Sequence, residues 1–145
     1  MISPQTKDID IVSLLKDKQE QVIPLALSEM YLNSRPKSAW VWWTFPSNIT
    51  LVNQPEPLIY LTSNTVLLYL NSYPLEWKYL MLRIYKTIHY LRKPMVAIFT
   101  DKSHQKYIKI SIKFLLQALE KIDDPDVAWL YNCLRFFKKN FNNFF

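Results

Sequence analysis

The chain has 145 residues, of which half are hydrophobic and 15% are aromatic, and it contains no glycine and a single cysteine. This composition excludes an intrinsically disordered chain and a disulfide scaffold, and the lack of glycine excludes glycine-rich phosphate loops, dinucleotide fingerprints and glycine nucleophile elbows. The net charge of +6 attracts anionic partners only mildly, and no apolar run is long enough to predict a membrane span.

The N-terminal stretch predicts helix, because apolar residues recur at every third or fourth position. Asp8 or Asp10 is expected to cap its start. Since proline disrupts a helix interior, Pro24 predicts either two helices, over 9–18 and 21–33, or one kinked helix.

The densest aromatic cluster of the chain follows, over residues 39–46. Residues 47–58 are rich in proline and asparagine and predict an irregular connection. Thr62-Ser-Asn-Thr then supplies an N-cap for a short helix of about nine residues.

Two longer helices are expected in the second half of the chain. Pro74 suits the first turn of a helix that runs to about Leu91 and is ended by Pro94. Residues 95–99 are a short buried run that fits either type of element. Residues 103–122 show both a strand-like alternation and an apolar helix face, but their length and the lack of glycine for hairpin turns favour helix.

Asp123-Asp-Pro-Asp predicts the start of the last helix. A helical protein tolerates the lack of glycine best, because asparagine can take the left-handed position that follows a helix end. The sequence therefore predicts one all-α domain over residues 1–145, with five or six helices and the aromatic segment at its centre.

Metal, cofactor and thiol chemistry have little support in the sequence. His89 and His104 are the only histidines, and no carboxylates cluster near them at ligand spacing. Cys133 lies among apolar residues of the last helix, which is typical of a buried, unreactive thiol. We predict neither a metal nor a cofactor.

The tryptophan segment has two interpretations. Trp40, Trp42 and Trp43 lie beside Arg35 and Lys37, and stacking faces next to cations can hold a nucleotide. The same indoles could instead fill the core of a small helical protein.

Glu29 is the nearest candidate acid or base to the tryptophans. A carboxylate among indoles would be desolvated and its pKa raised, which suits general acid–base catalysis. An ordinary exposed glutamate is the alternative.

Two surface features could bind a partner. Four lysines at helical spacing form a basic helix face, which is most simply a solvated face: Lys102, Lys106, Lys109 and Lys113. Nucleic-acid binding is a third and less favoured hypothesis, and it would need this face to join Arg35 and Lys37 in one patch. The C-terminal aromatic residues Phe141, Phe144 and Phe145 either dock on the core or form an exposed interaction patch.

The tryptophan segment also carries a family resemblance. The block Ser28-Glu-Met-Tyr-Leu-Asn-Ser-Arg-Pro-Lys-Ser-Ala-Trp-Val-Trp-Trp-Thr-Phe-Pro-Ser resembles, without a gap, one found in small bacterial proteins labelled calpastatin-like. Residues 61–75 and, loosely, 106–114 resemble later blocks of that family. The resemblance implies an all-helical fold, similar to the NADAR domain of NAD and ADP-ribose metabolism.

The chain departs from that family mainly at polar positions. Pro36, Ala39 and Ser47 stand where the family has lysine, histidine and glutamine, and Ser34 replaces its glycine. The resemblance therefore implies a fold that kept its packing residues and lost polar groups of a site.

Two functions follow, and the sequence leaves open whether the chain is an enzyme. The first is a non-catalytic binding or structural module with a protein partner, recruited to a larger assembly. The second is an N-glycosidase acting on an ADP-ribose-like nucleotide, with Glu29, Arg35 and Trp40 in one pocket. The residue usage follows an AT-rich genome, such as that of a virus, an endosymbiont or an AT-rich microbe. Because the first residues lack the basic and apolar regions of a secretion signal, we expect an intracellular protein, in host cytoplasm or virion if viral.

Overall fold

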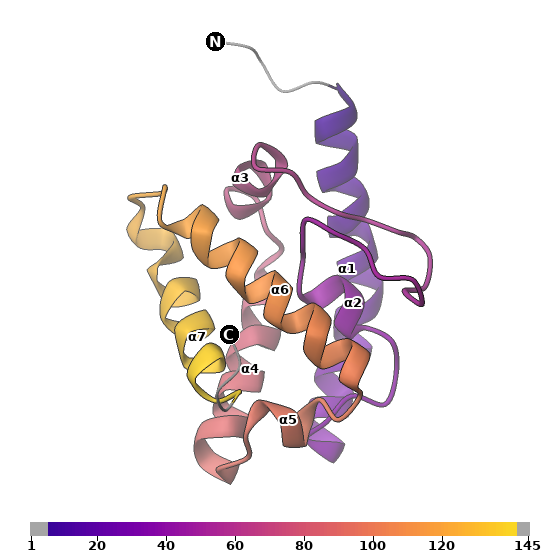
Figure 1. Cartoon of the computed structure of the whole chain (residues 1–145), viewed down its shortest axis with the longest axis vertical. Coiled ribbons are helices and arrows are strands. Elements are labelled where there is room, and N and C mark those ends of the chain that lie inside the picture. Colours follow the sequence, from indigo (N-terminus) through magenta and orange to yellow (C-terminus); the bar gives the residue numbers. More distant parts are fainter. Residues whose placement is uncertain (1–5, 142–145) are drawn as a thin grey trace.

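The computed structural model describes residues 6–141, and this part of the chain is helical without any strand (Figure 1). Its helices are α1 (Thr6–Asn33), α2 (Val41–Thr44), α3 (Thr65–Leu70), α4 (Leu75–Leu91), α5 (Met95–Ile98), α6 (Lys102–Leu119) and α7 (Ala128–Lys139), and a 3-10 turn over Pro125–Val127 leads into α7. The predicted all-α fold is confirmed. Seven helices replace the expected five or six because single turns form in the aromatic segment and in residues 95–99.

The N-terminal segment forms one helix that continues through Pro24. Pro24 is exposed, whereas its neighbours Ile23 and Ala26 are fully buried, so packing on the inner face holds the helix where one backbone hydrogen bond is missing. The expected caps are wrong: the helix begins at Thr6 and Asp8 lies inside its first turn, where a carboxylate still favours the positive helix end.

The other helices begin and end close to the predicted residues. Pro74 directly precedes α4, which ends at Leu91 as expected. Residues 102–119 form a helix rather than a strand. The Thr62 hydroxyl accepts a hydrogen bond from the Thr65 amide at 3.2 Å, so this segment satisfies one amide at the start of α3. Asn64, which directly precedes the helix, makes no side-chain capping bond, and the helix has six residues rather than nine.

Left-handed backbone occurs at Ser34 and Arg92, the residues directly after α1 and α4. Serine and arginine occupy these two positions, which asparagine could also have taken. At the first of these positions the Ser34 amide donates to the Met30 carbonyl at 3.1 Å, which satisfies a carbonyl group in the last turn of α1.

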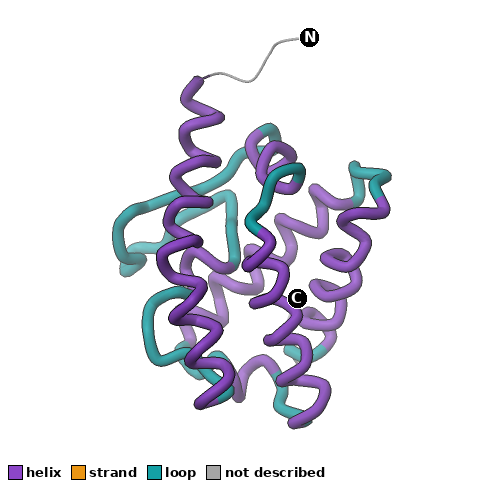
Figure 2. Tube along the Cα trace, turned by 180° about the vertical axis from the view of Figure 1, so that it is seen from behind, coloured by secondary structure: helices purple, strands orange, loops and turns teal. Residues whose placement is uncertain are grey.

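The helices enclose one core in which the aromatic segment is central. From behind, α1 and α4 run side by side (Figure 2), and α6 crosses the opposite side of the molecule next to α7. Buried polar groups join these layers: Gln19 of α1 donates to the Trp43 carbonyl at 2.9 Å and accepts from the Tyr69 hydroxyl at 2.7 Å. Trp77 of α4 donates through Nε1 to the Thr44 carbonyl at 2.8 Å. The aromatic segment is therefore held by hydrogen bonds from both α1 and α4.

Candidate functional site

The three tryptophans of the candidate site lie in the core. Trp40, Trp42 and Trp43 are each at most 5% exposed. The ring of Trp40 meets Phe99 edge-on, and that of Trp42 packs against Tyr107 with ring centres 5.0 Å apart. A nucleobase could stack on these indoles only if the core opened, so the structure favours the packing interpretation over the stacking one.

The carboxylate of Glu29, near the end of α1, is surrounded by donors from one returning loop. Its Oε1 accepts from the Lys37 amide at 2.6 Å, the Ser38 amide at 3.0 Å and Trp40 Nε1 at 2.8 Å. Its Oε2 accepts from the Ser38 hydroxyl at 2.6 Å. Glu29 thus ties the loop that enters the aromatic segment to the helix that precedes it.

This geometry sets the protonation state of Glu29. Burial raises the pKa of its carboxyl, but the hydrogen bonds from Ser38, Lys37 and Trp40 together outweigh burial and hold the pKa below its ordinary value. The expected raised pKa is therefore wrong. At neutral pH the group is an ionised acceptor without a proton to donate, which is unsuited to a general acid.

A pocket of about 280 Å³ lies on the outer side of the same loop. It is lined by residues 36–39 of the loop, by Ile98 at the end of α5 with residues 99–101 that follow it, and by His104. Glu29 and Trp40 contact each other behind this wall, while Arg35 is exposed and is not among the lining residues. The three side chains expected in one pocket are thus not brought together there, although Lys37 does reach it.

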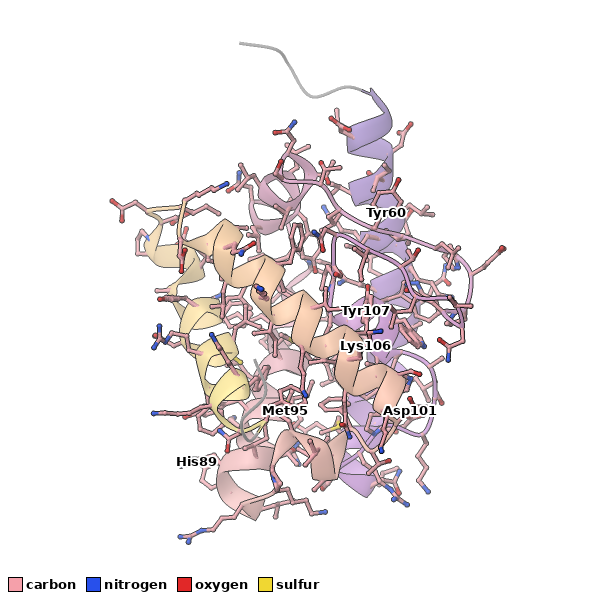
Figure 3. The ribbon with its side chains drawn as sticks, in the orientation of Figure 1. Tyr60, His89, Met95, Asp101, Lys106 and Tyr107 are labelled. Atoms are coloured by element: carbon pink, nitrogen blue, oxygen red, sulfur yellow. The ribbon has the colours of Figure 1, made fainter. Side chains whose placement is uncertain are left out.

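His104 lines this pocket, although the sequence analysis did not predict it as a site residue. Burial lowers its pKa, and Asp101 offsets part of that effect, so the imidazole is neutral at pH 7. Its ring meets Trp42 edge-on at 5.1 Å, and Asp101 caps α6 by accepting from the Ser103 and His104 amides (Figure 3 labels Asp101). The Asp101-x-x-His104 spacing at a helix start was the signal available in the sequence.

The remaining predicted residues lie elsewhere. Lys102, Lys106 and Lys113 are exposed on α6, and the Lys109 ammonium lies 5.4 Å from the ring centre of Phe141. Phe141 is buried at 1% exposure, so of its two alternatives the structure supports docking on the core, and Phe141 is not part of an exposed interaction patch. Phe144 and Phe145 fall outside the described residues.

Residues 6–141 give little support for thiol catalysis, metal binding or a membrane span. Cys133 is buried, and burial raises the pKa of its thiol, which makes it a poor nucleophile as expected. Within the described part of the chain, three His, Cys, Asp or Glu side chains nowhere gather closely enough to hold a metal ion. None of the helices in that part has the length and apolar character needed to cross a membrane.

Comparison with known protein families, curated proteins and solved structures found no match to this chain. The site is therefore interpreted from its own geometry.

Glu29→Gln is expected to lower the free energy of unfolding at pH 7 by about 3 kcal/mol. The buried hydrogen-bond network loses its charged acceptor, and the new side-chain NH2 group would face the N–H and O–H donors that bond the carboxylate now. Since the folded-state pKa is depressed, this stabilisation is present above the ordinary value of 4.5 and is lost as pH falls below it. Urea denaturation at pH 7 and pH 3 measures both effects. Glu20→Gln, an exposed change on the same helix, is the control and should alter neither; an equal response of the two variants would contradict the account.

Proposed function

We propose that this chain is a non-catalytic binding module that contacts a protein partner. The observation that carries the proposal is that the two Glu29 carboxylate oxygens together accept four hydrogen bonds within the protein. A group so engaged has little capacity to bind or protonate a substrate. The only candidate catalytic residue of the sequence is therefore assigned to structure.

A protein partner is supported by the outer face of α1. Leu14, Leu25 and Leu32 are 48%, 49% and 79% exposed. Their spacings of 11 and 7 residues place them on one line along a helix of 3.6 residues per turn. Single exposed apolar residues are ordinary, but several aligned on one helix are typical of a surface that another protein covers.

The resemblance to the calpastatin-like and NADAR-like proteins fits the same proposal. Pro36 and Ala39, which replace the family's lysine and histidine, line the 280 Å³ pocket. Ser34, which replaces its glycine, has a φ of 57°, a conformation that favours glycine. We propose that the chain descends from such a fold, lost the polar groups of the pocket, and works inside a cell, as a component of a viral assembly if its genome is viral.

The alternative, an N-glycosidase acting on an ADP-ribose-like nucleotide, is favoured by the position of the pocket alone. Lys37 and neutral His104 could contact a phosphate and a base there. The volume of about 280 Å³ falls just below the range of about 300–1,000 Å³ that is usual for small-molecule sites.

Incubation with millimolar NAD, ADP-ribose or a mononucleotide is expected to give no cleavage above the buffer rate and no rise in the unfolding temperature. A ligand present at 100 times its Kd should stabilise the protein by about 2.7 kcal/mol. Chromatography of the products and thermal unfolding measure the two quantities. Turnover or a thermal shift that Lys37→Ala abolishes, while Lys16→Ala does not, would support the N-glycosidase alternative instead.

For the partner, a photo-crosslinking amino acid at Leu25 is expected to give a discrete adduct of fixed mass in the source cell, while the same probe at Lys86, on α4, gives none. Gel mobility and mass spectrometry of the adduct measure this. Equal labelling at both positions, or none at Leu25, would overturn the assignment of the α1 face.

A further inference from the structure

Charge is unevenly distributed along this chain. Residues 1–76 carry 5 Lys and Arg against 7 Asp and Glu, whereas residues 77–145 carry 13 against 5. Neither α6 nor α7 contains an acidic residue. The net positive charge therefore belongs to the second half of the chain, and α6 and α7 carry much of it.

The lysines of α6 form a line on its outer side. Lys102, Lys106, Lys109 and Lys113 follow at intervals of four, three and four residues, which span about 16 Å along a helix axis. The opposite side of α6 is buried, and the helix crosses the front of the molecule, where Figure 3 labels Lys106. We call these four residues the basic stripe.

A fifth lysine extends the basic stripe onto the neighbouring helix. Lys138 of α7 lines one hollow together with Lys109, Ile110 and Lys113. At the other end of α6, Lys37 shares the 280 Å³ pocket with Asp101 and His104. Asp101 is the only carboxylate of that pocket, and it accepts hydrogen bonds from the amides of the first turn. The positive surface thus runs from the Lys37 loop across α6 to α7.

We propose that this surface binds the phosphate backbone of double-stranded nucleic acid without reading its sequence. The basic stripe is longer than one phosphate group and matches an extended polyanion. Single strands are held by stacking on exposed aromatic side chains, and the described residues of α6 and α7 present no aromatic residue that is more than partly exposed. Lysine acts as a point charge toward phosphate, which suits contact with the backbone rather than with base edges.

The test is fluorescence anisotropy of a labelled 20-base-pair duplex between 50 and 200 mM salt. Four phosphate contacts predict a log–log slope of about −3.6 and an affinity loss of about 150-fold over this range. Changing the four stripe lysines to Gln should remove most of the slope and weaken binding at least tenfold at 50 mM salt. Lys106→Gln combined with Lys113→Gln changes two exposed positions and should remove about half of the slope. This double variant serves if the fourfold variant fails to fold.

The matched control changes Lys16, Lys86, Lys93 and Lys121 to Gln, which lowers the net charge from +6 to the same +2. It should keep the slope. If the stripe and control variants lose affinity and salt slope equally, net charge alone explains the binding and the proposal is overturned. No duplex binding at 50 mM salt, tighter binding of a single strand of the same length, or stripe-dependent binding to phosphatidylserine vesicles without duplex binding would each overturn it as well.

Discussion

The arrangement of this molecule depends on one carboxylate near the end of its longest helix. Glu29 accepts four hydrogen bonds from the loop that follows α1, and the last of these donors is the indole of Trp40. Trp40 begins the buried segment whose carbonyl groups then accept from Gln19 of α1, Trp77 of α4 and Ser111 of α6. The direction in which the chain turns after α1 thus determines which helices can meet around the aromatic core. A buried carboxylate can have this role because four donors compensate for the loss of its hydration.

Much of the fold could be predicted because its signals are local. Pro74 and Pro94 bracket α4, and the apolar face that the sequence shows over residues 103–122 forms a helix as far as Leu119. Features that depend on contacts between distant segments could not be predicted. The burial of Phe141 arises in tertiary packing, and the helix through Pro24 survives because Ile23 and Ala26 are packed on the other side.

The candidate site shows the same division. The sequence places Glu29 near the tryptophans, but the direction of its pKa shift depends on the number of donors that the loop returns to it, which spacing does not reveal. Desolvation alone would raise the pKa, and hydrogen bonding to the ionised form reverses the sign. The position of His104 near a helix start could be predicted from the sequence. Its ring contact with Trp42 could not, because that contact requires α2 and α6 to meet in the fold.

The Glu29 carboxylate is engaged in hydrogen bonds within the protein, and the molecule has two distinct outer surfaces, on α1 and α6. We therefore favour binding over catalysis as its function. The aligned leucines of α1 and the basic stripe of α6 lie on different helices, so a protein and a polyanion could be bound at the same time. The central claim is that Glu29 is ionised and structural. It is tested most directly by following the side-chain carboxyl carbon of Glu29 by NMR as pH is lowered. The account predicts that this carbon titrates below the ordinary value of 4.5 for as long as the protein stays folded; titration well above that value would contradict it and return Glu29 to the role of an acid.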